Sequence, residues 1–144
     1  MDDGFKSAIT LAFVAVGWFV VNGQNNKRET RKEYRSLVDS AKVEARTIAK
    51  LSLDDMIAGA GKNALEITSG LTALEVNLER FPNFNDNTPL MQAFVSFEDA
   101  LTGGDFQSAT RVARDPNHPD IAKVLRCRNA LFVELERKFK GLYT

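Results

Sequence analysis

Residues 8–21 read AITLAFVAVGWFVV and form the centre of a longer run, 7–26, that contains no charged side chain. A helix that crosses a bilayer needs about 20 mainly apolar residues, because lipid offers its backbone no hydrogen-bond partner. As a helix, the apolar centre would extend over about 21 Å of a hydrocarbon core about 30 Å thick, so both ends of the run must lie near the interfaces. We therefore expect residues 1–26 to form an N-terminal tail followed by a short transmembrane anchor.

Two other interpretations of this run stay open. A cleaved signal peptide also has a short apolar segment, but it usually starts with basic residues, whereas this chain starts with Asp2 and Asp3. A buried core helix of a soluble protein is the second alternative, because the apolar centre is shorter than a typical transmembrane span. The residues that follow the run favour the anchor over both alternatives.

A basic cluster follows the apolar run directly, whereas only Lys6 precedes it. An excess of lysine and arginine marks the cytoplasmic flank of a transmembrane helix. We therefore predict a single-pass protein with its N-terminus outside and its C-terminal domain in the cytoplasm. The same basic side chains would be attracted to anionic lipid headgroups. The predicted membrane-interface residues are Trp18, Lys27, Arg28, Arg31, Lys32 and Arg35.

The rest of the chain, 27–144, is predicted to be a cytoplasmic helical domain. It contains no strand-like alternation of apolar and polar residues, so the predicted fold class is all-α, a small bundle of about four helices. Neither Gly nor Pro interrupts residues 27–56, so the anchor should continue as a juxtamembrane helix over 27–52. Ser52 and Asp55 have the spacing of a capping box, which would mark a break in the helix there.

Two further helices are delimited by apolar spacing and by terminal signals. Residues 62–80 carry apolar side chains three and four apart, after a turn expected at 59–61. Thr88 and Pro89 have the N-cap and first-turn signals of the next helix, because proline fixes a helical φ where no N–H partner is needed. The glycine pair 103–104 should end that helix.

The C-terminal part is expected to contain a short helix and a long one. Asp105 is expected to cap the short helix, which would carry Phe106, Ala109 and Val112. The long helix is expected to begin at Pro119 and to end near Leu142. Its predicted inward face consists of Ile121, Val124, Leu125, Leu131, Leu135 and Phe139.

Apolar residues recur along the juxtamembrane helix with heptad-like spacing. This stripe indicates either the core-facing side of a bundle helix or a short coiled coil. In the anchor, Ala8 and Ala12 form a small-xxx-small step that would let two helices approach closely. Both features favour a homo-oligomer. The stripe consists of Tyr34, Val38, Ala41, Ala45 and Ile48.

Composition argues against several classes of function. The chain has 19 basic and 19 acidic residues, and beyond the juxtamembrane cluster no basic excess suits nucleic acid. Cys127 and His118 are the only residues of their types, so they cannot supply the usual zinc ligands. Cys127 is a thiolate candidate if exposed between its arginine neighbours, and a small apolar residue if buried. Without a clustered catalytic set, we expect no enzyme, cofactor or metal.

The tripeptide His118-Pro119-Asp120 resembles the signature of the J-domain co-chaperones. In that family the tripeptide lies in a loop between two antiparallel helices and stimulates the ATPase of a heat-shock chaperone. The resemblance implies a membrane-anchored co-chaperone. This chain departs from the family in that Pro119 is expected to begin a helix.

Two segments, NNKRETRKE at 25–33 and LTGGDF at 101–106, resemble segments of uncharacterised single-pass membrane proteins of bacteria and their prophages. The resemblance implies placement in a bacterial inner membrane and no particular activity. We therefore predict a membrane-anchored helical interaction or scaffold protein that self-associates and binds an unknown protein partner. A membrane-acting effector of the prophage or defence type is the alternative, and a J-domain-like co-chaperone is the third.

Overall fold

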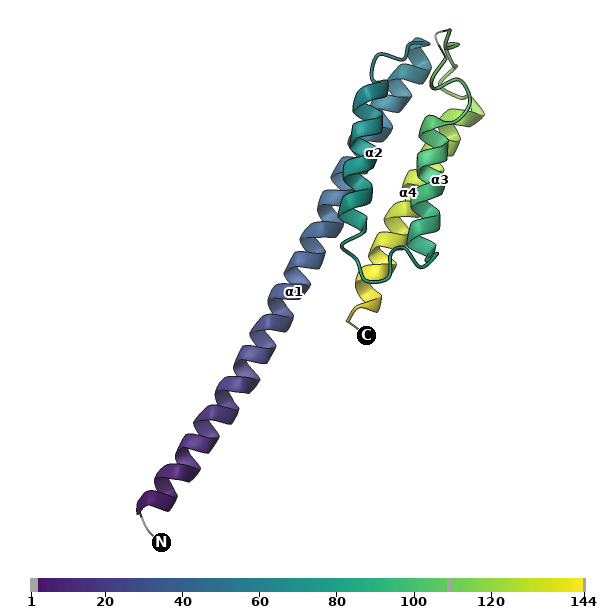
Figure 1. The fold of residues 1–144 in the computed structure, drawn as a ribbon. Coiled ribbons are helices and arrows are strands. Elements are labelled where there is room, and N and C mark those ends of the chain that lie inside the picture. Colours follow the sequence, from purple (N-terminus) through teal and green to yellow (C-terminus); the bar gives the residue numbers. More distant parts are fainter. Residues whose placement is uncertain (1–2, 109, 144) are drawn as a thin grey trace. The chain divides into compact units, whose positions relative to one another are not determined.

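The computed structural model of the chain describes residues 3–108 and 110–143, with side chains described from Ser7 onward. The described residues form four helices and no strand (Figure 1), which confirms the all-α prediction. The helices are α1 (Asp3–Ala58), α2 (Ala64–Leu78), α3 (Pro89–Thr102) and α4 (Pro119–Gly141).

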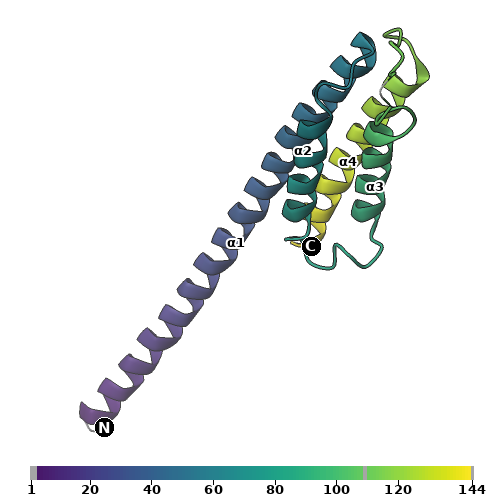
Figure 2. The same cartoon turned by 45° about the horizontal axis from the view of Figure 1, so that its top comes forward.

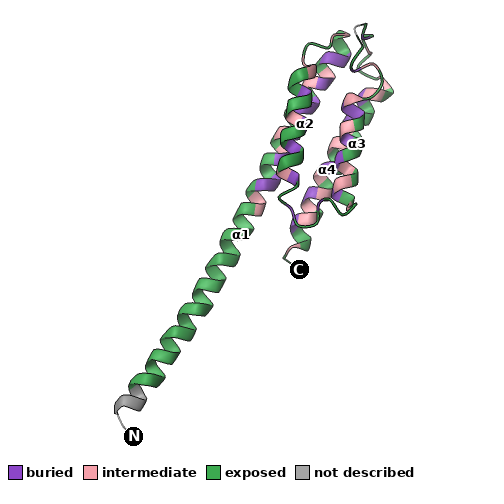
Figure 3. Ribbon diagram, viewed as in Figure 1, coloured by how far each residue is buried: buried purple, intermediate pink, exposed green. Residues whose placement is uncertain are grey.

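The chain divides into two compact units, Met1–Ser36 and Leu37–Thr144. The first unit contains the N-terminal part of α1, in which every residue from 7 to 33 is exposed (Figure 3). The second unit contains the rest of α1 and the other three helices. All the buried residues of the described chain belong to this second unit, so it alone has a hydrophobic core.

Side-chain contacts place the four helices of the second unit in a ring. On α1, Ile48 lies against Gly70 of α2, and Lys42 forms an ion pair with Glu136 of α4. Helix α3 completes the ring because it packs against both α2 and α4, and Figure 2 shows α3 beside α4. In consequence α1 and α4 form one side of the bundle, and α2 and α3 form the opposite side.

The heptad-like stripe of α1 faces the core of this bundle. Val38, Ala41, Ala45 and Ile48 are each at most 2% exposed. The stripe is therefore the core-facing side of a bundle helix, the first of its two predicted interpretations. Because these side chains are buried within their own chain, they are not available to a coiled coil with a second copy.

The predicted helix ends after residue 58 are largely confirmed. The Thr88 hydroxyl accepts a hydrogen bond from the Met91 N–H at 3.2 Å, and Pro89 occupies the first turn of α3. Gly103 caps the C-terminus of α3, and Gly104 has φ +63°, a left-handed conformation that glycine adopts without strain. These local signals were sufficient because they act within one helical turn.

The break predicted at Ser52 and Asp55 is wrong, because α1 continues to Ala58. Both side chains are fully buried inside the bundle instead of capping a helix start. The Asp55 carboxylate accepts hydrogen bonds from the backbone N–H and the side-chain amide of Asn63, at 3.0 and 2.9 Å. It thus stabilises the turn that follows α1.

The short helix predicted after Asp105 is also absent from the described residues, where only a turn at 104–107 follows α3. The Asp105 carboxylate accepts a hydrogen bond from the Val112 N–H at 3.0 Å, across seven residues instead of the two or three of an N-cap. Phe106 is buried as expected, whereas Val112 is 69% exposed, and Ala109 lies outside the described residues.

Candidate functional site

The first candidate site is the exposed apolar part of α1. Most of the large side chains there are more than half exposed, for example Leu11 at 69%, Phe13 at 75% and Phe19 at 68%. By length and composition this helix is apolar enough to span a membrane, and none of its apolar window is buried in the protein. A core helix of a soluble protein would bury this surface, because about 25 cal/mol is gained for each Å² removed from water.

The predicted membrane-interface residues lie along this part of α1. Trp18 packs edge-on against Phe19, with ring centroids 5.3 Å apart and an interplanar angle of 72°. The five basic residues are exposed except Arg35, which is half-buried. At about 100° of rotation for each residue, positions 27, 28, 31, 32 and 35 share one side of the helix, spanning about 140°. Glu29 and Glu33 lie on the other side, so the basic residues form a continuous stripe.

A second candidate is a polar network at the end of the bundle where α1 ends and α4 begins. Its centre is Arg111, whose side chain is 1% exposed and lies 3.9 Å from Asp55 and 3.8 Å from Asp105. The guanidinium also stacks over Phe106, 5.6 Å from the ring centroid. Within the described residues, Nε and one terminal nitrogen of Arg111 have no hydrogen-bond partner, so the network is held by charge and by ring contact.

Arg114 extends this network to the start of α4. It donates hydrogen bonds to Asp105 at 2.6 Å and to Asp120 at 2.9 Å, and its backbone N–H donates to the Met56 carbonyl at 2.8 Å. The hydrogen bond from Arg114, followed by the one from the Val112 N–H, lowers the pKa of Asp105. These bonds fix the segment between α3 and α4 onto the C-terminal end of α1.

Sequence reasoning did not find this network. Its acidic and basic members lie on separate segments, and Asp55 meets Arg111 only after the bundle has formed. No local spacing links them, so only the fold brings them together. The network contains no nucleophile, and we interpret it as a structural lock on the segment between α3 and α4.

The tripeptide 118–120 acts as a helix start. The His118 Nδ1 accepts a hydrogen bond from the Asp120 N–H at 3.1 Å, and Pro119 is the first residue of α4. The Asp120 carboxylate is bonded to Arg114. The arrangement therefore differs from the loop in which J-domains carry this tripeptide, and its polar groups are engaged in capping and in the lock.

The remaining candidate residues do not converge on a reactive group. Cys127 is a free, half-buried thiol on α4, between Arg126 and Arg128. Among the described residues, no group of three or more His, Cys, Asp or Glu side chains is placed to hold a metal ion.

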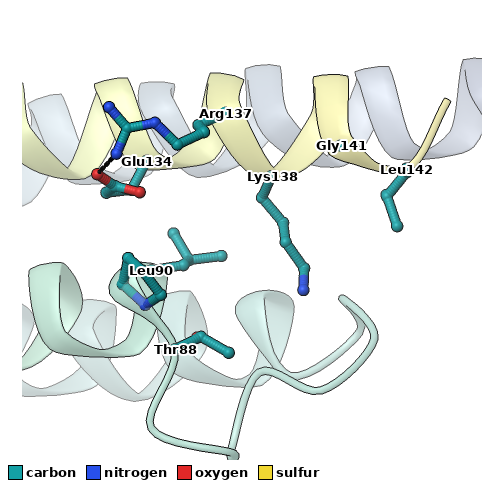
Figure 4. A pocket seen from close by; sticks show the side chains of 8 residues that line it. Thr88, Leu90, Glu134, Arg137, Lys138, Gly141 and Leu142 are labelled. Carbon is teal, nitrogen blue, oxygen red and sulfur yellow. Dashed lines mark hydrogen bonds and ion pairs between the residues drawn. The ribbon is translucent and has the colours of Figure 1, made fainter. Parts of the chain in front are cut away.

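A cavity of about 290 Å³ lies between the start of α3 and the end of α4 (Figure 4). The ion pair of Glu134 and Arg137 borders it, and Lys138 extends beside it. The Thr88 hydroxyl in its wall is already bonded to the backbone of Met91 and Phe84. The apolar part of its lining consists of Pro89 and Leu90 on α3 and of Leu142 after α4, and the lining residues include no catalytic pair.

Comparison with known proteins gives no relative: no family model, no curated protein and no solved structure matches this chain. The candidate function therefore depends on the geometry and the chemistry of the chain itself.

Proposed function

We propose that this chain is a single-pass protein of the bacterial inner membrane, whose helical domain lies in the cytoplasm, associates with further copies and binds a protein partner. The function proposed is binding, not catalysis. The observation that supports it is the apolar window of α1, which is fully exposed and is followed directly by the basic stripe.

Exposure of this apolar surface is the physical reason for the anchor. Side chains such as Phe13 and Phe19 would order water around them in solution, whereas hydrocarbon accepts them at no such cost. The backbone of the segment is helical throughout, so its N–H and C=O groups need no partner from the lipid. A bilayer therefore satisfies the whole segment, from Ser7 to the residues that precede Lys27.

The basic stripe supports the proposed orientation and gives the anchor a second contact. Lysine and arginine near a membrane surface each contribute about 1 kcal/mol of attraction to anionic lipids. Because the five basic residues share one side of the helix, they can all face the headgroups when that side leans toward the membrane. The acidic Glu29 and Glu33 then face away from it.

Replacing two apolar residues at the centre of the window tests the anchor. Each lysine at the centre of a spanning helix costs about 2.5–3.5 kcal/mol, so Phe13→Lys with Val16→Lys should release the chain from membranes washed with alkaline carbonate. Val43→Lys with Val112→Lys is the matched control, because both valines are exposed in the second unit, at 60% and 69%. Wild type that washes off as readily as the double variant contradicts the anchor.

Two further measurements on the same cells separate the alternatives. Mass analysis of the purified chain reports a signal peptide, because cleavage near residue 23 would remove the apolar window. A membrane-potential dye reports an effector, because a scaffold leaves the potential intact whereas an effector that perturbs the bilayer collapses it.

Cys127 provides a direct route to the orientation, because it is the only cysteine. In a Cys127→Ser background, Asp2→Cys should react with a membrane-impermeant maleimide added to spheroplasts. Ser108→Cys, which lies in the exposed segment after α3, should react only after the cells are opened. The reverse pattern of labelling contradicts an outside N-terminus.

A further inference from the structure

The charges of the second unit are unevenly divided between the two sides of the bundle. Helices α2 and α3 contain no lysine or arginine, and their charged residues are Glu66, Glu75, Glu98 and Asp99. Helix α4 on the other side carries six basic residues against three acidic ones. Residues 37–58 of α1 add three basic and four acidic residues, so the side formed by α1 and α4 carries nine basic and seven acidic residues and is only slightly basic, whereas the α2 and α3 side is acidic.

The acidic side has a definite centre, which we call the acidic face and define as Glu75, Glu98 and Asp99. Glu98 lies half-buried on α3, Asp99 beside it and Glu75 on α2 are exposed, and α2 packs against α3. Burial, followed by repulsion from Glu75 and Asp99, raises the pKa of Glu98. Neither α2 nor α3 carries a lysine or arginine that would offset these three carboxylates.

The opposite side has a hollow with an aromatic floor, which we call the basic groove. On its floor the Phe132 ring of α4 carries cations from two helices: Arg46 at 4.9 Å, Lys42 at 5.8 Å and Arg128 at 5.8 Å from the ring centroid. An adjoining cavity of about 450 Å³ is lined by Lys42, Phe132, Val133, Glu136, Arg137 and Lys140.

The positive charge of the basic groove exceeds what its own carboxylates neutralise. Glu136 pairs with Lys42, and Glu134 pairs with Arg137. Arg46 and Arg128 contact the Phe132 ring, and neither forms an ion pair with a carboxylate of the described residues. An aromatic ring contacted by an exposed Arg46 and a half-buried Arg128 is a suitable centre for an interface, since aromatic and arginine side chains dominate binding energy in such patches.

We propose that copies of this chain associate front to back, with the acidic face of one bundle docked in the basic groove of the next. The inference deepens the self-association proposed above and rests on it. Charge complementarity identifies the occupant, because the chain that carries the basic groove also carries, on its opposite side, an acidic surface without a basic residue on α2 or α3.

This geometry has a consequence for the assembly. The two surfaces differ and lie on opposite sides of the bundle, so one contact leaves a free acidic face and a free groove for further copies. Such a heterologous contact forms a ring if the rotation closes and a filament if it does not. Copies anchored in one membrane would have to dock with their bundle axes roughly parallel, so that the Leu37 end of every bundle points in the same direction.

Two charge-reversed variants of the full chain in detergent micelles test the proposal. Arg46→Glu with Arg128→Glu reverses the groove, and Glu75→Lys with Glu98→Lys reverses the acidic face. Sedimentation equilibrium over a range of concentrations should give wild-type species larger than a dimer at low salt. Either variant should weaken association by about tenfold or more, because like charges then meet at the contact. Raising the salt to about 0.5 M should weaken the wild type in the same direction.

Mixing experiments report whether the contact joins unlike surfaces. An equal mixture of the two variants should associate again, because each reversed surface meets a complementary one on the other variant. The groove-reversed variant added to wild type should shorten the assemblies, since it docks by its acidic face and offers no groove to the next copy. Circular dichroism checks the fold, and the neutral pairs Arg46→Gln with Arg128→Gln and Glu75→Gln with Glu98→Gln replace any reversal that unfolds.

Several outcomes overturn the inference, and they are distinct from a failure of the anchor. If both charge-reversed variants associate as tightly as wild type, association must occur through the transmembrane segment. That outcome leaves the proposed function intact. Variants that each fail and do not rescue one another indicate contact between like surfaces. A wild-type monomer at all concentrations removes self-association altogether, whereas carbonate extraction still reports the anchor. Preferential binding of anionic vesicles or of an oligonucleotide to the groove would assign it another partner.

Discussion

The side chain of Ile48 on α1 lies so close to Gly70 on α2 that a Cβ at position 70 would come within 2.9 Å of Ile48 Cγ1. Real Cβ contacts essentially never fall below 3.0 Å, so the absence of a side chain at Gly70 sets how closely these two helices approach. Glycine costs about 1 kcal/mol relative to alanine inside a helix. Gly70 thus lowers the helix propensity of α2 but permits the close approach of α1 and α2.

Gly70→Ala is expected to destabilise the bundle although it improves helix propensity. Overpacking a core costs about 1–3 kcal/mol, which exceeds the propensity gain of about 1 kcal/mol. In an Ile48→Ala background the same change should become neutral or stabilising, because the clash is gone. Urea unfolding of the four chains of this double-mutant cycle measures the coupling. Gly141→Ala is the control, since nothing lies within 4 Å of its added Cβ.

Arg111→Met is expected to destabilise the second unit strongly. The substitution leaves Asp55 buried without its cation and removes the stacking on Phe106, and loss of one partner of a buried pair costs about 3–5 kcal/mol. Adding Asp55→Asn should recover part of this loss, because no uncompensated carboxylate remains. Thermal unfolding of the single and double variants measures both effects. Equal stability of wild type and Arg111→Met would show that the Arg111 contacts contribute nothing to the free energy of unfolding.

Asp105→Asn is expected to lower stability in a way that depends on pH. The hydrogen bond from Arg114 lowers the pKa of this carboxyl in the folded protein, so its contribution is present above the unfolded pKa of about 3.9. It is lost as the pH falls through the lower folded pKa. The variant should lose about 1.5–3 kcal/mol at neutral pH, the value of a charged hydrogen bond. Denaturant unfolding at several pH values should show the two proteins converging in acid.

Asp115→Asn is the matched control for that experiment. Asp115 is exposed, and its carboxylate accepts only a local hydrogen bond from the Asn117 N–H at 2.8 Å. Its loss should cost well under half as much at neutral pH. A constant difference between wild type and Asp105→Asn across the whole pH range would contradict the assigned titration.

Glu98→Gln is expected to stabilise the bundle at neutral pH, the opposite sign to Asp105→Asn. Burial first, and then Glu75 and Asp99, raise the folded pKa of Glu98, so its charged form destabilises the fold. This cost is present above the folded pKa and is absent below the unfolded pKa of about 4.3. A gain of about 0.5 kcal/mol, typical of relieving one like-charge contact near a surface, should appear in urea unfolding at neutral pH and fade in acid.

Glu66→Gln serves as the control on α2. Glu66 lies in the first turn of that helix, where a negative charge interacts favourably with the helix dipole. The substitution should therefore be slightly destabilising. If both glutamine variants stabilise the protein equally, the effect reflects net charge and not the repulsion at the acidic face.

Local signals predicted most of the fold. The turn at 59–61, the N-cap at Thr88 and the helix start at Pro119 each depend on residues within one turn, and each lies where it was expected. The helix expected after Asp105 failed for the opposite reason. Arg114 and the Val112 N–H bind this carboxylate from farther along the chain, and such tertiary partners override the local cap.

The candidate sites also differ in whether the sequence alone predicts them. The apolar window and its basic flank are contiguous in sequence, so composition alone identified them. The basic groove needed the fold, because Arg46 reaches the Phe132 ring only when α1 and α4 lie side by side. The acidic face likewise needs the fold, because Glu75 and Glu98 lie on two helices, α2 and α3, that pack against each other. No spacing of residues along the sequence predicts either the basic groove or the acidic face.

The absence of lysine and arginine from α2 and α3 also determines how this protein responds to chemical probes. Amine-reactive cross-linkers would label the side of the bundle that carries α1 and α4 and would leave the acidic face unlabelled. Carboxyl-activating reagents are therefore needed to identify the residues that contact the acidic face. Tryptic cleavage sites are distributed equally unevenly, because Arg80 is the only cleavage site between Lys62 and Arg111. Each of the two acidic helices would therefore emerge intact on its own peptide.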